Sequence, residues 1–323
     1  MTPMTPIVHA VTVRSAADGT VAVDSSLTES PRHSPELRTA KEFLLARVPG
    51  VYTCARAVPL DHARGLRLVM WDFHIDRLSA GLKTIRPALS LDVLNALRRE
   101  AKNAVDEVLG FVPVNGELSQ HLMVTVLLSS SMDGLDRIDV HVCLMPEACT
   151  ATVLVFGRYR VNAICKHSQW IIDRIPFESH QCEVATSVGV EIHETILSHN
   201  DTSGDRLLTE GLITNFFIIR HGTIFTCNSD ILRGSTRELV LSACKVLGVP
   251  VVFSNPRLSE IGSWEAAFVT SAVRIVVPIA RVMWHLDEDS TSIQYRDLPS
   301  TTTIESSFLQ SLRETIHTLW RSC

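Results

Sequence analysis

The amino-acid sequence predicts an α+β protein of two domains. Its 323 residues fit one large domain or two ordinary domains of roughly 100–200 residues each. Segments with the two-residue period of strands are interspersed with segments of helical period. A short polar stretch at 146–148 interrupts the strand-like runs near the middle of the chain. We therefore expect a small N-terminal domain at 41–147 and a larger C-terminal domain at 148–323.

Residues 1–40 are predicted to form a disordered tail. They are rich in Ser, Thr and Pro and poor in large apolar side chains, so they have little surface to bury. The first 17 residues contain one arginine, Arg14, and no acid. A transit peptide is usually richer in arginine. We expect a cytoplasmic protein, with organellar import as the alternative.

The first domain is predicted to contain two helices and four strands. A turn with Pro59, Asp61 and Gly65 separates the first two strands. Asp72 is a plausible N-cap for the first helix, which carries apolar residues on one face. The predicted strands are 51–58, 66–71, 121–130 and 137–145, and the second helix is 91–109.

The second domain is richer in strand patterns. His221 and Gly222 form a tight-turn dipeptide between two strands. Gly248 is placed to end a helix at 237–247, and a last helix fits 304–320. The predicted strands are 152–156, 189–196, 213–220, 223–227, 249–253, 266–269 and 275–282.

The composition excludes several classes of protein. Thirty basic and 35 acidic residues give a net charge of −5, which does not indicate a nucleic-acid surface. No uninterrupted apolar run reaches the roughly 18–20 residues of a membrane span. The eight cysteines form no CxxC pair, and we expect buried free thiols. A zinc site at His141, Cys143 and Cys149 is the alternative, but it lacks a second ligand pair, so we predict no metal.

Two charged residues in apolar surroundings are candidates for chemistry. Lys166 is the one lysine between Lys102 and Lys245. Apolar surroundings favour the neutral, nucleophilic amine, although a surface lysine whose stem covers apolar residues fits the same pattern. Glu210 precedes Gly211 and a buried strand, where a carboxylate requires a cationic or protonated partner. An ordinary turn acid is the alternative.

Two further segments could bind an anion. Gly234, Ser235 and Thr236 open a helix, and the free N–H groups of a helix start attract anions. A simple Ser/Thr cap explains the same residues. Arg77 lies one helical turn after His74 and could hold a phosphate through paired N–H donors, or it could be a surface arginine.

Read together and in order, these segments resemble the class IV aminotransferases, which are fold-type IV pyridoxal-phosphate enzymes. Branched-chain and D-amino acid aminotransferases and aminodeoxychorismate lyase belong to this family. The segments "GVYTCAR" and "FHIDRL" resemble the family's G-V-Y-E and H-x-x-R-L, and "EGLITNFF" resembles E-G-x-x-x-N-x-F. "LRGSTRELVL" resembles its P-G-I-T-R helix start, and "AAFVTSAVRIVVPI" resembles its last strand pair. The resemblance runs from about Gly50 to Val282.

The resemblance implies roles for individual residues. Lys166 would form the internal aldimine with pyridoxal 5′-phosphate. Glu210 would face the pyridine nitrogen, and Arg77 would bind the phosphate. The further positions that the resemblance assigns to cofactor binding are Asn215, Ser235, Thr236, Thr270 and Ser271.

The chain departs from the family pattern at three places. The interval of 44 positions from Lys166 to Glu210 is about ten residues longer than the family leads us to expect, which suggests an extended loop near 173–183 or 199–206. Trp170 and Ile171 stand where many members carry a tyrosine. Arg233 replaces the usual proline before the glycine. These changes affect the expected substrate pocket more than the cofactor-binding positions.

The resemblance implies a pyridoxal-phosphate-dependent aminotransferase with the cofactor in a cleft between two domains. Its substrates would be an amino acid and a 2-oxo acid, and the enzyme would be a homodimer. A lyase of the aminodeoxychorismate type would use the same cofactor-binding residues. A degenerate, non-catalytic member is the third hypothesis.

Overall fold

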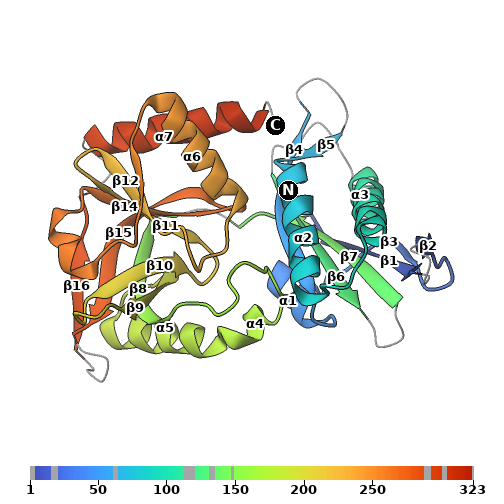
Figure 1. Ribbon diagram of the computed structural model, residues 1–323, viewed down its shortest axis with the longest axis horizontal. Helices are drawn as coiled ribbons and strands as arrows, with labels where there is room; N and C mark the ends of the chain where they lie inside the picture. The colour runs from blue at the N-terminus through green and yellow to red at the C-terminus, as the bar shows by residue number, and fades with distance from the viewer. Residues whose placement is uncertain are drawn as a thin grey trace. The chain divides into compact units, whose positions relative to one another are not determined.

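The computed structural model describes residues 4–15, 21–60, 65–112, 121–130, 135–146, 149–286, 292–299 and 304–321. The chain divides into two compact units (Figure 1). The first comprises Met1–Pro146 with Cys165–Ile172, and the second comprises Glu147–Ile164 with Asp173–Cys323. The predicted boundary residues 147 and 148 lie outside the described residues. The segment that carries Lys166 packs with the N-terminal unit, whereas the sequence assigned it to the C-terminal domain.

The first unit is built on an antiparallel seven-stranded sheet within the described residues. The strand order is β2-β1-β7-β6-β4-β5, and β3 also pairs with β1. The strands are β1 Ile7–Ser15, β2 Val21–Val23, β3 Glu29–His33, β4 Val51–Pro59, β5 Leu66–Leu68, β6 Leu122–Ser130 and β7 Leu135–Leu144.

The prediction of a disordered tail at 1–40 is wrong for the described part of that segment. Strand β1 pairs with β7 over eight residue pairs, from Ile7↔Val142 to Arg14↔Leu135. Ile7 and Val13 are fully buried. The Ser and Thr content suggested disorder, but Ile7, Val11 and Val13 point to one face of the strand and join the main apolar cluster, which contains residues of the helix Leu91–Phe111.

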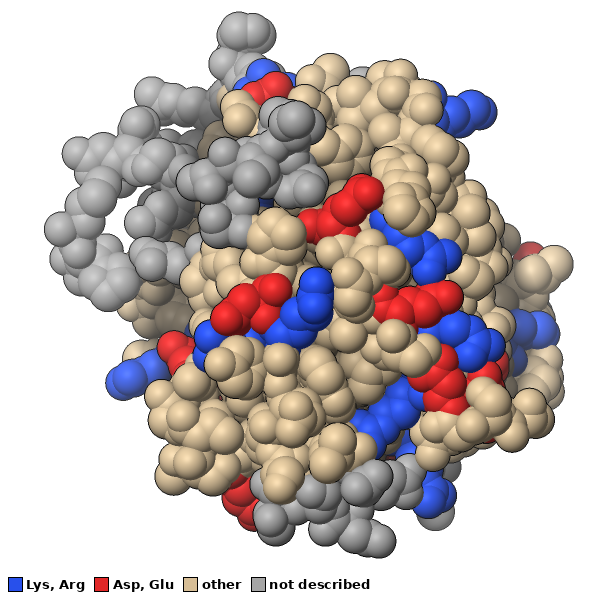
Figure 2. Space-filling view, turned by 90° about the vertical axis from the view of Figure 1, so that its left-hand side faces the viewer, with Lys and Arg blue, Asp and Glu red and all other residues tan. Residues whose placement is uncertain are grey.

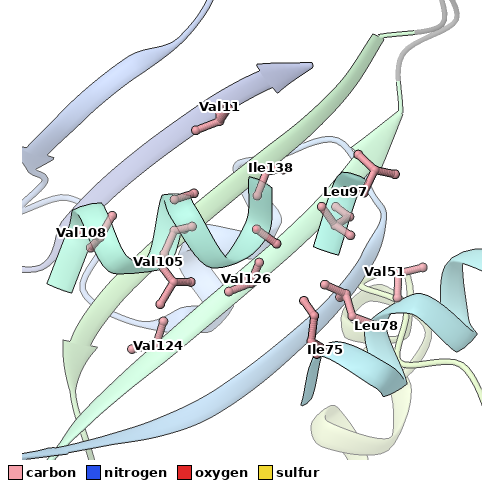
Figure 3. Packing of buried hydrophobic residues seen from close by; sticks show 14 of the residues in the cluster. Val11, Val51, Ile75, Leu78, Leu97, Val105, Val108, Val124, Val126 and Ile138 are labelled. Atoms are coloured by element: carbon pink, nitrogen blue, oxygen red, sulfur yellow. The ribbon is translucent and has the colours of Figure 1, made fainter. Parts of the chain in front are cut away.

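Helices α2 (Trp71–Ile85) and α3 (Leu91–Phe111) cover one face of this sheet. Figure 3 shows Ile75, Leu78 and Leu97 packed against strand residues such as Val126. Burying each of these side chains contributes about 1.5–3 kcal/mol relative to exposure. The predicted N-cap Asp72 is wrong by two positions, because α2 begins after Met70, whose backbone is left-handed (φ 54°). The negative charge of Asp72 still lies in the first turn, where the helix dipole favours it.

The opposite face of the sheet is covered in part by the short helix α1 (Ala40–Leu45). Thr39 caps this helix, and the side chain of Glu42 returns a hydrogen bond to the cap backbone. Phe43 and Leu44 point into a second apolar cluster that contains Tyr52 and Leu127. Strand β4 therefore has both faces covered, which fixes the direction of each of its side chains.

The second unit contains a nine-stranded sheet within the described residues. The order is β10-β9-β8-β15-β14-β11-β12-β13, and β16 pairs with β15. An additional pairing of β10 with β11 closes six of these strands into a ring. The strands are β8 Ala151–Arg158, β9 Glu194–Asn200, β10 Arg206–Gly211, β11 Asn215–Arg220, β12 Thr223–Thr226, β13 Val251–Phe253, β14 Ala266–Ser271, β15 Ile275–His285 and β16 Ile293–Asp297.

Helices connect and cover this sheet. They are α5 Ile175–Val188, α6 Ser235–Leu247, the 3₁₀ helix η1 Leu258–Ser263 and α7 Ile304–Arg321. The short helix α4 Trp170–Asp173 lies mainly in the first unit, where Ile171 packs with Phe43. Gly248 ends α6 with a left-handed backbone (φ 67°), as predicted. The extra length between Lys166 and Glu210 is not a loop at 173–183, because α4 and α5 occupy that stretch. At 199–206 the chain turns between β9 and β10.

Charged side chains of both signs are mixed on the surface. On the face in Figure 2, basic and acidic residues lie beside one another rather than in separate patches. Arg281 with Asp297 and Arg257 with Asp201 are examples of such pairs in the second unit. No described helix is both long and apolar enough to cross a membrane.

Candidate active site

In the first unit, the candidate phosphate ligand Arg77 belongs to a buried network. Its Nη2 atom donates to Thr53 Oγ1 at 2.9 Å, and Thr53 Oγ1 lies 2.7 Å from His74 Nδ1. Thr53 is on β4, and both partners are on α2. His74 and Arg77 are three positions apart, so they lie on one face of the helix, above a strand residue that faces them.

The hydrogen bonds of this network favour one form of His74. Because the Thr53 oxygen accepts from Arg77, its single hydrogen is available for His74 Nδ1, which then accepts. Nε2 carries the proton in that tautomer. Complete burial lowers the pKa of His74 well below 6.5, and the charges of Arg77 and Lys166 lower it further. His74 is therefore neutral, and the two cations keep the positive charge in this region.

The backbone of Lys166 is attached to the start of β4. Its carbonyl accepts from Tyr52 N at 2.8 Å, and Ser168 exchanges two hydrogen bonds with Gly50 (2.9 and 3.0 Å). The Lys166 Nζ atom lies 4.7 Å from the centre of the Tyr52 ring, within cation–π range. Lys166 and Arg77 are both half-buried, and both contact side chains of β4. Their charges act together on His74.

In the second unit, three candidate residues form a row across neighbouring strands. Glu210 on β10 pairs with Asn215 on β11, and Asn215 pairs with Thr270 on β14. All three are at most 4% exposed. The row occurs where β10 and β11 close the ring, so the predicted positions meet because of that closure.

The carboxylate of Glu210 is fixed by the loop before α6. Its Oε2 atom accepts from Leu232 N at 3.0 Å and from Asn215 Nδ2 at 3.5 Å. Asn215 also donates to the Leu232 carbonyl at 2.7 Å and accepts from Gly234 N at 3.1 Å. Asn215 therefore joins the Glu210 strand to the helix start that carries the other candidates.

The first turn of α6 can accept an anion. Its N-cap is Gly234, and no side chain caps the helix. Ser235 and Thr236 follow, each about 5% exposed. The N–H groups of an uncapped helix start, with two adjacent hydroxyls, are a donor set that suits phosphate.

Thr270 and Ser271 differ in their hydrogen bonding. The Thr270 hydroxyl is buried and has no hydrogen-bond partner in the described part of the chain. A buried hydroxyl without a partner is costly, so this atom fits a ligand that accepts or donates there. Ser271 instead accepts from Arg274 N at 3.0 Å in the turn between β14 and β15.

Three buried residues at these sites were not predicted as functional from the sequence. Thr53 stands where the family motif has a glutamate. Glu194, at the start of β9, accepts hydrogen bonds from residues 212–214. Arg237 is 1% exposed and donates to the Cys227 carbonyl and to Asn228. Only Arg237 had a sequence signal, since it is the arginine of the "GSTR" segment.

The three residues of the alternative zinc site have other environments in the structure. His141 stacks on Phe43, and its Nε2 atom donates to the Leu37 carbonyl at 2.8 Å. Burial raises the pKa of Cys143 to about 12, so the thiolate needed for zinc is disfavoured. Cys149 is exposed. Among the described residues, no three potential ligands gather around one point.

The described cysteines are free thiols, and most of them are shielded from solvent. Cys143, Cys165, Cys227 and Cys244 are buried, and Cys54 is partly buried, in line with the prediction. Cys149 and Cys182 are exposed, so the prediction does not hold for them. Cys323 lies outside the described residues.

Residues 183–282 match the model of the amino-transferase class IV family. The match contains the Glu210–Asn215–Thr270 row and the start of α6, and it begins after Arg77 and Lys166, which it therefore does not include. The chain is also similar to solved structures over nearly its whole length. One is a branched-chain aminotransferase from Thermoproteus uzoniensis, with 18% identity, TM-score 0.60, and 96% of this chain and 95% of the other covered.

Two other solved structures are similar to this chain over nearly its whole length. A fold IV transaminase from Curtobacterium pusillum is 18% identical with a TM-score of 0.62, covering 94% of this chain and 98% of the other. A hypothetical aminotransferase from Mycobacterium tuberculosis in its PLP-bound form is 15% identical with a TM-score of 0.60, covering 95% and 98%. The fold-type IV architecture expected from the sequence motifs is confirmed.

Proposed function

We propose that this chain is a member of the class IV amino-transferase family, whose model it matches at 183–282, and that it is a pyridoxal-phosphate-dependent enzyme that moves an amino group from an amino acid to a 2-oxo acid. The observation that supports this best is the buried row of Glu210, Asn215 and Thr270 beside the uncapped start of α6. It combines a carboxylate with a phosphate-binding donor set.

The residues of this chain suit the cofactor. Ser235, Thr236 and the unpartnered Thr270 hydroxyl offer donors to a phosphate group. Arg77, supported by Thr53, offers a guanidinium to the same group. Lys166 offers an amine for covalent attachment. These assignments are part of the proposal.

Glu210 and Lys166 would perform different tasks. When bound, pyridoxal phosphate supplies an electron-withdrawing ring that stabilises negative charge at the substrate Cα. The Glu210 carboxylate would keep a proton on the ring nitrogen, because an adjacent negative charge favours the protonated form. The Lys166 amine would take the proton from the substrate Cα and return one during transfer.

The substrates are proposed only as classes, an amino acid and a 2-oxo acid. We also propose a homodimer, on the basis of the family resemblance, and a cytoplasmic location, on the basis of the free thiols and the arginine-poor N-terminal segment. A lyase that uses the same cofactor-binding residues would differ in its products.

The first test is covalent capture of the cofactor. Protein incubated with pyridoxal phosphate should develop the absorbance of a lysine-bound cofactor, and borohydride reduction with peptide mapping should find the label on Lys166. Lys166→Ala should lose the label, whereas the exposed control Lys245→Ala should retain it. A label on Lys245, or a protein that takes up no cofactor, would contradict the proposal.

The second test separates a transferase from a lyase. A panel of amino donors is supplied with 2-oxo acid acceptors, and both products are measured. Transamination requires a new amino acid and a new oxo acid in equal amounts. Product formation without an acceptor would identify a lyase, and a cofactor-binding protein inactive with every donor would support the non-catalytic hypothesis.

A further inference from the structure

A buried carboxylate outside the predicted site receives four hydrogen bonds. Glu194, the first residue of β9, is 4% exposed. Its Oε1 atom accepts from Thr195 N at 3.0 Å and from Leu212 N at 3.1 Å. Leu212 N also donates to the Thr195 carbonyl at 3.1 Å. The Glu194 Oε2 atom accepts from Thr214 Oγ1 at 2.9 Å and, more weakly, from Ile213 N at 3.4 Å. Three of these donors belong to one short segment.

That segment is the turn between Glu210 and Asn215. Gly211 N donates to Thr214 O at 2.9 Å, which closes the turn. A Cβ atom at Gly211 would lie 2.1 Å from Thr214 Oγ1 and 2.8 Å from Glu194 Cδ, so only glycine fits. The carboxylate thus lies in a concavity of backbone N–H groups, an arrangement that binds anions.

The surroundings of Glu194 act on its pKa in opposite directions. Burial raises the pKa of Glu194, while the Thr214 hydroxyl, the Thr195 amide and the charge of Arg174 act in the opposite direction. Its four neighbours all donate, and an ionised carboxylate can accept from all of them. A protonated acid or an amide would bring a hydrogen toward these donors.

We propose that Glu194 is a positioning residue that caps the turn at 211–214 and thereby holds the Glu210 carboxylate in the ring-closing row. Strands β10 and β11 pair directly only at Glu210↔Asn215, so the turn is the main local support of that pair. Glu194 acts through the backbone and does not touch the cofactor. The inference rests on the function proposed for Glu210.

The first experiment uses the full-length, cofactor-free protein. Amide hydrogen exchange at Ile213, whose N–H donates to Glu194, is compared in the wild type, Glu194→Gln and Glu191→Gln. Glu191 is a matched control, because it is an acid of the same segment with an 85% exposed side chain. We expect at least tenfold faster exchange in Glu194→Gln alone. Unchanged exchange in that variant would overturn the proposal.

A second pair of variants decides the question if Glu194→Gln does not fold. Thr214→Val removes the hydroxyl that donates to Glu194, and Thr214→Ser retains it. Exchange at Ile213 should be faster in the valine variant than in the serine variant. Equal exchange in the two variants would overturn the proposal.

The third measurement connects the turn to Glu210. With pyridoxal phosphate bound, the pH at which the cofactor absorbance changes should shift in Glu194→Gln and not in Glu191→Gln. A purely structural acid would lower stability without moving this pH. If no variant or wild-type protein takes up the cofactor, the proposed function fails, while the exchange experiments still decide whether Glu194 caps the turn.

Discussion

Single residues in this protein acquire their properties from a few buried partners. The Glu210 carboxylate is fixed by Leu232 N and Asn215, and the neutral state of His74 is fixed by burial and two nearby cations. Neither environment can be read from the local sequence. Each gives a measurable consequence.

Replacing Glu210 by glutamine should leave cofactor binding largely intact and slow the reaction about 100-fold. Glutamine is nearly isosteric, so Leu232 N keeps an acceptor. Without the negative charge, the ring nitrogen loses the partner that favours its proton. Two factors of ten correspond to about 2.7 kcal/mol of barrier. Cofactor absorbance and single-turnover rates measure the two effects, and a wild-type rate would mean that Glu210 does not face the ring nitrogen.

His74 should make the protein less stable as the pH falls below 6.5. Its pKa is depressed in the folded state, so below 6.5 the unfolded chain binds a proton that the native residue does not. The stabilisation is present above pH 6.5 and decreases with a slope of up to about 1.4 kcal/mol per pH unit below it. Urea unfolding of wild type and His74→Gln between pH 7 and 5 isolates this contribution. Parallel curves for the two proteins would refute it.

At the scale of elements, the start of α6 is the feature that the sequence predicts best. Gly234 and Gly248 bound the helix where the motif and the C-cap rule expected it. The register of the row across β10, β11 and β14 comes from strand pairing, which a single sequence does not specify. Helix α5 was missed because its sequence has no clear apolar face, and Val184 is its one buried residue.

Gly234→Ala should disturb the join between Asn215 and α6. A Cβ atom at this position would lie 2.4 Å from Asn215 Oδ1, so the hydrogen bond from Gly234 N must lengthen or break. We expect a loss of about 1–3 kcal/mol in stability, as for overpacked sites, together with weaker cofactor binding. Gly110→Ala is the control, since nothing lies within 4 Å of that position. Thermal unfolding and cofactor titration should show no loss in the control, and equal behaviour of both variants would contradict the steric argument.

At the scale of the whole molecule, the sequence predicts the α+β class and the family but not the extent of the first unit. The segment 1–40 looked like a tail because Ser, Thr and Pro dominate its composition. Burial of β1 depends on β7, more than 120 residues away in the chain. Glu194 was missed for the same reason, since a lone acid before a strand gives no sign of the turn that it contacts.

Deleting residues 1–15 should unfold the first unit rather than leave it unchanged. Strand β1 lies between β2 and β7 in the sheet order, and its loss exposes β7 and uncovers Val105 and Val108 of α3. Arg14→Ala, an exposed change in the same strand, is the control. Circular dichroism and soluble yield should be normal for the control and strongly reduced for the deletion. A stable, active deletion protein would restore the tail hypothesis.

The position of β1 also constrains synthesis of the chain on the ribosome. Ile7 pairs with Val142, which is translated 135 residues later. At about 5–20 residues per second, β1 waits on the order of ten seconds without its partner, although β3, which also pairs with it, follows soon after. During that time the apolar face of β1 is available to other nascent chains and to chaperones. Slow translation between β3 and β7 therefore lengthens the period in which β1 lacks its β7 partner.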